Sequence, residues 1–134
     1  MDEQLRDTLK SNAEIVVSKI GKLAEFDFGY DAKSVTWVDG FIERQRPWLG
    51  NDIPQVDGLI NMIGSYLGEA IIHCYGGEWH QEIGKGICIR FPDNCQAYPF
   101  TKVRKQFENG PEDSIASFFA LIPVVFKFEP RSGS

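Results

Sequence analysis

The amino-acid sequence predicts an α+β fold: helices pack on one face of a three-stranded antiparallel β-meander, and a C-terminal helix follows the sheet. From residue 2 to residue 75, apolar side chains recur every three or four positions, which is the helical period. After Gly76-Gly77 the period becomes two and stays so to residue 100, which is the period of strands. From residue 101 the helical period returns. A helical half, a short meander and further helices therefore make up the expected chain.

Size and composition favour one globular domain. The chain has 134 residues, of which 43% are apolar and 25% are charged, as in an average globular protein. Two domains of half this length would each have a marginal core. We therefore assign residues 1–130 to a single domain. Residues 131–134 are a polar tail, either natural or added, and are left out of the fold.

Three helices are expected before the sheet. The first spans residues 2–26, where apolar positions form one stripe and two acids stand at the start. The second begins with Ser34 as its N-cap and ends at Pro47. The third, residues 53–75, has the strongest helical period in the sequence, which predicts the central helix of the fold.

Gly64 and Gly68 stand one turn apart on this third helix. A glycine in a helix interior costs about 1 kcal/mol relative to alanine. We interpret the pair as a site where the backbone of another element approaches closely.

The sheet and the last helices follow from turn residues. Three strands, residues 78–83, 87–91 and 95–100, are separated by tight turns. A short helix over residues 101–108 comes next, and Pro111, Glu112 and Asp113 open the last helix. Pro123 is expected to kink or end that helix before the apolar run of residues 124–128.

Charge and cysteine content exclude several classes of function. The net charge is −5, so no dominant field draws the chain to nucleic acid or to an anionic membrane surface, and a basic partner suits it better. Three cysteines, Cys74, Cys88 and Cys95, are odd in number and lack CxxC spacing, which indicates reduced thiols. No signal peptide or membrane span is recognised, so the expected location is the cytoplasm.

Residues with chemical potential form one stripe on the third helix, at i, i+4 spacing: Asn61, Ser65, Glu69 and His73. Glu69 could tune His73 as a general base, with Ser65 nearby. The other interpretation is a solvated or partner-facing polar edge of an amphipathic helix, and it is the one we favour. No histidine and cysteine spacing matches a zinc pattern, and no serine nucleophile or phosphate loop is recognised, so neither a metal nor a cofactor is expected.

Four motifs occur in order along the chain: Ile63-Gly64-Ser65-Tyr66-Leu67-Gly68-Glu69, Tyr75-Gly76-Gly77-Glu78-Trp79, Tyr98-Pro99-Phe100 and Gly110-Pro111-Glu112-Asp113-Ser114-Ile115. Over about residues 34–122 they resemble a family of small bacterial proteins of unknown function, with an LGxxLGE helix, a GGxW turn, an FP-like step and a GxxDSI helix start. Tyr98-Pro99-Phe100 departs modestly from the FP-like step. The motifs resemble structural rather than catalytic ones. Small acidic domains of this kind are similar to immunity proteins encoded beside secreted bacterial toxins.

We therefore expect a cytoplasmic immunity protein, not an enzyme, that binds a cognate toxin effector domain with a basic surface and occludes its active site. The expected binding residues are Asp31, Asp39, Glu43, Trp48 and Asp52. Asp39 and Glu43 are one helical turn apart and would present a paired negative edge, unless these acids serve only solubility. The fallback face is the sheet around Glu78, His80 and Glu82. The alternative function is a small enzyme or ligand-binding protein that uses Glu69 and His73; neither the toxin nor the oligomeric state is predicted.

Overall fold

A computed structural model describes residues 1–125 and confirms the α+β class, the three-stranded antiparallel sheet and the C-terminal helix. The helices are α1 (Glu3–Ile15), α2 (Ala32–Leu49), α3 (Ile53–Tyr75), α4 (Pro99–Asn109) and α5 (Ile115–Val125). The strands are β1 (Glu78–Glu82), β2 (Gly86–Arg90) and β3 (Gln96–Ala97). Short turns of π or 3-10 helix complete the order: η1 (Val16–Ile20), η2 (Gly21–Leu23) and η3 (Gly110–Asp113). Within residues 1–125 we find no helix with the length and apolarity needed to span a membrane.

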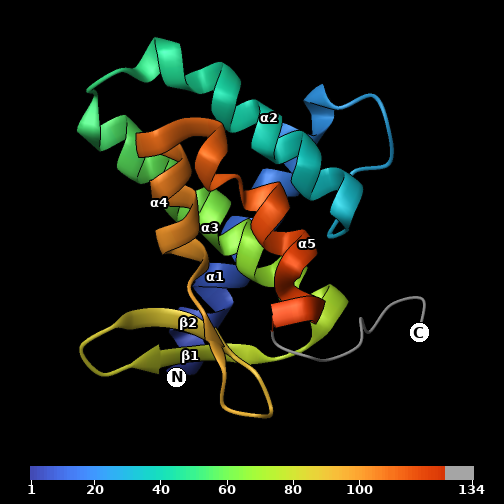
Figure 1. Cartoon of the computed structure of the whole chain (residues 1–134), viewed down its shortest axis with the longest axis vertical. Helices are drawn as coiled ribbons and strands as arrows, with labels where there is room; N and C mark the ends of the chain where they lie inside the picture. The colour runs from blue at the N-terminus through green and yellow to red at the C-terminus, as the bar shows by residue number, and fades with distance from the viewer. Residues whose placement is uncertain (126–134) are drawn as a thin grey trace.

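The sheet lies at one end of the helices (Figure 1). β2 is the middle strand, and Trp79 of β1, Ile89 of β2 and Ala97 of β3 stand opposite one another in register. All three side chains are buried, because this face of the sheet packs against the core. Side chains alternate along a strand, so Glu78 and His80 lie on the other face.

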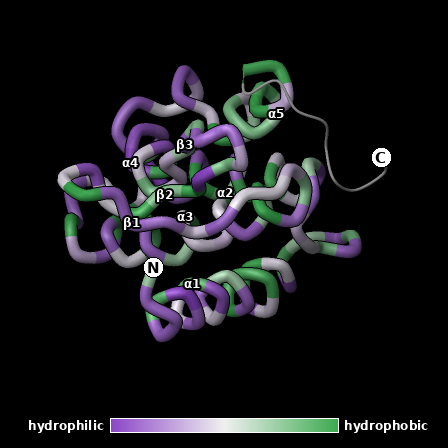
Figure 2. The backbone as a smooth tube through the Cα atoms, turned by 90° about the horizontal axis from the view of Figure 1, so that it is seen from below, coloured by the Kyte–Doolittle hydropathy of each residue, from purple (hydrophilic) through white to green (hydrophobic). Residues whose placement is uncertain are grey.

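Helix α3 is the centre of the fold, as the periodicity predicted. Its residues 63–71 are buried on every side of the helix. Figure 2 shows α1 along one side of the molecule and α5 on the opposite side, and both pack against α3. A helix enclosed in this way has no solvated face over its middle turns.

Gly64 and Gly68 do mark a close approach, but the neighbours are aromatic rings rather than backbone. A Cβ atom at Gly68 would collide with the indole of Trp79, and one at Gly64 would collide with the ring of Phe100. Trp79 is the second residue of β1, and Phe100 is the second residue of α4. The two glycines therefore seat the sheet and α4 directly on the central helix.

Several helix boundaries differ from those predicted. The first helix is α-helical only to Ile15 and continues as the π and 3-10 turns to Leu23. The N-cap of α2 is Asp31 and not Ser34, because the Asp31 carboxylate accepts a hydrogen bond of 2.8 Å from the Ser34 N–H. Pro47 does not end α2, which continues to Leu49; a proline in the last turn removes only one hydrogen bond.

Proline also explains the differences after the sheet. β3 is shorter than predicted, because Pro99 has no N–H for a ladder and takes the first position of α4 instead. The segment from Pro111 to Asp113 belongs to a 3-10 turn, and α5 starts at Ile115 and runs through Pro123 to Val125. Residues 126–128 of the predicted apolar run and the tail 131–134 lie outside the described residues.

Candidate functional site

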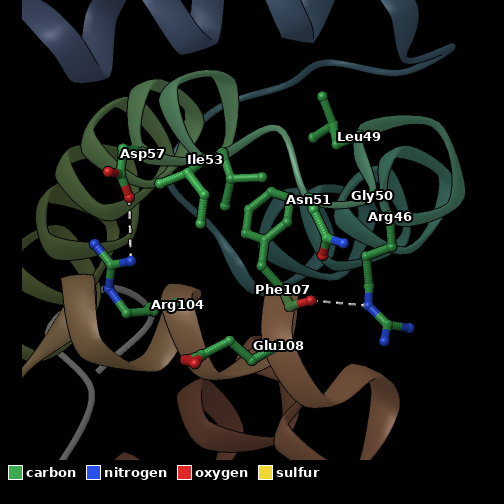
Figure 3. A pocket seen from close by; sticks show the side chains of 10 residues that line it. Arg46, Leu49, Gly50, Asn51, Ile53, Asp57, Arg104, Phe107 and Glu108 are labelled. Atoms are coloured by element: carbon green, nitrogen blue, oxygen red, sulfur yellow. Dashed lines mark hydrogen bonds and ion pairs between the residues drawn. The ribbon is translucent and has the colours of Figure 1, made fainter.

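A groove lies where the turn between α2 and α3 faces α4 (Figure 3). The turn is sharp, because Gly50 has a positive φ of 52° and Asp52 immediately caps α3. The groove has a volume of about 460 Å³, within the range of small-ligand pockets. Its lining comes from all three helices and the turn: Arg46, Leu49, Gly50, Asn51, Ile53, Val56, Asp57, Arg104, Phe107 and Glu108.

The groove has an apolar centre and an exposed apolar rim. Phe107 and Val56 are half-buried, and in Figure 3 the ring of Phe107 lies between Ile53 and Asn51. The Ile53 side chain is 64% exposed, and Trp48, one residue before Leu49, is 86% exposed. A tryptophan that leaves most of its surface in water, on the helix turn that leads into such a groove, is typical of a protein-binding surface.

Ion pairs hold both arginines of the groove. Arg104 Nη1 donates to Asp57 Oδ1 at 3.1 Å, which joins α4 to α3. Arg46 Nε donates to the carbonyl oxygen of Phe107 at 3.2 Å, and its Nη1 donates to Glu43 Oε1 at 3.0 Å. Among residues 1–125, the Glu108 carboxylate has no cationic partner.

Four of the five predicted binding residues are acids, and two of these are helix caps. Asp31 Oδ1 accepts from the Ser34 N–H, and Asp52 Oδ1 accepts from the Gln55 N–H at 3.4 Å. Asp52 stays exposed at the groove's end of α3. The Asp31 and Asp52 carboxylates therefore stabilise helix N-termini, whether or not they also contact a partner.

The expectation that Asp39 and Glu43 form an outward-facing edge is wrong. Asp39 accepts from the Ser114 hydroxyl, from the Ala116 N–H at 3.0 Å and from Gln106 Nε2 at 3.0 Å, so this residue of α2 caps α5. Glu43 accepts from the same Gln106 amide at 2.9 Å. Gln106 is fully buried and also accepts from the backbone of α5. The two acids are thus part of a polar junction between α2, α4 and α5.

The stripe on α3 is not one continuous solvated edge: Asn61 and His73 at its ends are exposed, but Ser65 and Glu69 between them are buried. Ser65 Oγ donates to the carbonyl oxygen of Asn61 at 2.7 Å and is fully buried. Glu69 is only 5% exposed, and its Oε2 accepts from the indole N–H of Trp79 at 2.7 Å. His73 Nε2 lies 4.0 Å from Glu69 Oε1, beyond hydrogen-bond distance. The geometry places Glu69 as the anchor of Trp79.

His73 instead stacks on Tyr30, with ring centroids 4.5 Å apart. Burial, with smaller contributions from the nearby Glu69 and Glu14 carboxylates, raises the pKa of Tyr30 to about 12. The Tyr30 phenol is therefore neutral at ordinary pH and is a poor acid.

The outer face of the sheet carries the fallback residues in a small network. His80 Nε2 and Glu82 Oε2 are 2.9 Å apart, and Gln96 Nε2 donates to the same Glu82 oxygen at 2.7 Å. These hydrogen bonds lower the pKa of Glu82. Arg90 pairs with Glu78 at 3.2 Å. No sequence pattern indicated that Gln96 would join this network, because only the pairing of β3 with β2 places it near Glu82.

Cys88 lies under this network, and burial raises the pKa of its thiol. A buried, protonated thiol is a weak nucleophile. Within residues 1–125, no three potential ligands are grouped so that they could hold a metal ion.

The sequence analysis did not identify Arg104, Phe107 or Glu108 as site residues. They meet the turn after α2 only through tertiary packing, and no local motif signals such a contact. Comparisons with family models, with curated proteins and with solved structures gave no match.

Proposed function

We propose that this chain is a bacterial immunity protein that acts in the cytoplasm, binds a cognate secreted toxin and occludes the toxin's active site. The observation that carries the proposal is the Trp48 side chain, 86% exposed in the last turn of α2, one residue before the groove residue Leu49. Tryptophan is the residue most enriched among those that dominate protein–protein binding energy. The groove beside it offers a place for a partner side chain.

Charge supports the same partner. The net charge of −5 favours approach of a basic protein surface, and attraction between opposite charges speeds encounter. Asp52 and Glu108 bring two negative groups to the candidate surface. The resemblance to a family of small bacterial proteins of unknown function, which rests on the four motifs between Ile63 and Ile115, supports an immunity role because small acidic domains of this kind are similar to immunity proteins.

The roles of Glu69 and His73 in the fold favour a binding protein over an enzyme. A general base must lie within hydrogen-bond reach of the proton that it abstracts from the substrate. The Glu69 carboxylate is 5% exposed and holds the Trp79 indole, so it is withdrawn from solvent. We therefore do not assign a reaction to these residues.

Co-expression tests this proposal. The toxin-like polypeptide encoded beside this gene is produced in a bacterial host with and without the present protein, and growth is measured together with the Kd of the purified pair. We expect rescue of growth by the wild-type protein. Replacing a hot-spot tryptophan costs at least about 2 kcal/mol, so Trp48→Ala should raise Kd roughly 30-fold or more.

Ile83→Ala is the matched control, because Ile83 is 97% exposed in the turn between β1 and β2, away from the groove. It should bind like the wild type. Absence of a toxin-like neighbour, absence of rescue, or equal binding by Trp48→Ala would contradict the proposal.

A further inference from the structure

The groove between α2, α3 and α4 has an apolar floor and, in Glu108, a lining carboxylate without an ion-pair partner among residues 1–125. Its two arginines are held by Asp57 and by Glu43 with the Phe107 carbonyl oxygen. Within the described part of the chain, the carboxylates of Glu108 and Asp52 form no ion pair. The charge left for an incoming group to meet is therefore negative.

We propose that this groove receives one basic side chain, an arginine or a lysine, from the partner protein. The inference rests on the proposed function and names the chemistry that the partner presents to this site. The aliphatic stem of the side chain lies on Phe107 and Ile53, and its cationic head meets the Glu108 carboxylate. Long basic side chains combine an apolar stem with a charged head, which matches an apolar floor with a carboxylate on one wall.

An acidic side chain fits the same groove poorly. To reach Arg104 it would compete with Asp57, and to reach Arg46 it would compete with Glu43. It would also bring a further negative charge near Glu108, and like charges repel at this range. A purely apolar side chain would cover the floor and leave the Glu108 carboxylate less solvated without a partner, which costs free energy.

A titration with small probes tests the inference without any toxin. Three compounds of similar length are added to the isotope-labelled protein, and amide shifts are followed by NMR: n-butylguanidinium, n-pentanoate and n-pentanol. We expect n-butylguanidinium to bind most tightly and to shift the amides of Asn51, Ile53, Phe107 and Glu108. Glu108→Gln should weaken its binding about tenfold, the loss expected for one charge-assisted hydrogen bond.

Glu112→Gln is the matched control, because Glu112 is an exposed acid in η3 that does not line the groove. It removes the same charge and should leave probe binding unchanged. The inference is overturned if n-pentanoate or n-pentanol binds as tightly as n-butylguanidinium, if the shifts map outside the groove, or if Glu108→Gln binds the probe like the wild type. The spectrum of each variant confirms that it is folded.

The two proposals fail separately. Toxin neutralisation without n-butylguanidinium binding overturns the proposal of a basic side chain in the groove and leaves the immunity role in place. Probe binding at the groove without neutralisation of the neighbouring toxin overturns the immunity role and leaves the proposal of a basic side chain in place.

Discussion

Replacing Gly68 by alanine tests how the sheet is seated on α3. A Gly→Ala change in a helix interior stabilises the helix by about 1 kcal/mol when space is available. At Gly68 the new Cβ would collide with the Trp79 ring, where even Cζ3 would be only 2.9 Å away. The ring cannot move freely, because it is buried and its N–H is 2.7 Å from Glu69 Oε2. Overpacking costs about 1 to 3 kcal/mol, and a strained hydrogen bond to a buried carboxylate costs about 1.5 to 3 kcal/mol.

The expected net effect of Gly68→Ala is a loss of about 2 kcal/mol in the free energy of unfolding. At roughly 3 to 5 °C per kcal/mol for a domain of this size, Tm should fall by about 8 °C. Urea unfolding followed by circular dichroism measures the change in the free energy of unfolding. Gly68→Leu should act in the same direction and more strongly.

Gly58→Ala is the matched control within the same helix. Nothing lies within 4 Å of a Cβ at Gly58, so this variant should gain about 0.5 to 1 kcal/mol. If Gly68→Ala is as stable as the wild type, or gains as much as Gly58→Ala, the indole does not limit the space at Gly68 and the reasoning is refuted.

Two further predictions concern the polar junction and pH. Asp39→Ala should lower the free energy of unfolding by about 2 kcal/mol, because it removes the cap of α5 and one partner of the buried Gln106; a change under a quarter of this in urea unfolding would contradict the junction. The raised pKa of Tyr30 means that the folded state holds the phenol proton more tightly than the unfolded state, whose pKa is near 10.0. The contribution of Tyr30 to stability should therefore be complete below pH 10 and be lost as pH rises toward 12, and Tyr30→Phe should remove this part of the pH dependence; an identical alkaline profile for both proteins would contradict it.

The parts of the fold that depend on local pattern were predictable. Residues 53–75 carry an apolar period strong enough to fix the central helix, and Gly76-Gly77 ends it, as both glycines have positive φ. The change in the spacing of apolar residues, from every three or four positions to every second position, predicted the meander. The two interior glycines predicted a close approach, but only the structure identifies Trp79 and Phe100 as the neighbours.

The inward turn of Asp39 and Glu43 could not be predicted, because periodicity does not say which elements flank a helix's apolar stripe. In α2 the buried stripe is Val35, Val38 and Ile42, and each acid follows it by one position. Such boundary positions face solvent or a neighbour depending on what packs alongside. Here α4 and α5 pack alongside, from more than sixty residues further along the chain.

Whether an acid holds the fold together decides whether it can be used to test electrostatic recognition. Asp31 and Asp52 cap helices, and Asp39 and Glu43 join α2 to α4 and α5. These acids contribute to the electrostatic field that a basic partner meets, but they also hold the fold together. Reversing Asp39 and Glu43 to lysine would place two cations in the junction and destabilise the protein, so slower association could not be assigned to steering. Glu108 lines the groove without an ion-pair partner among residues 1–125, and charges interact over a Debye length of about 8 to 10 Å at ordinary salt. Glu108 is therefore the position where charge can be changed with the fold intact, and where a change in association rate reports on the binding face.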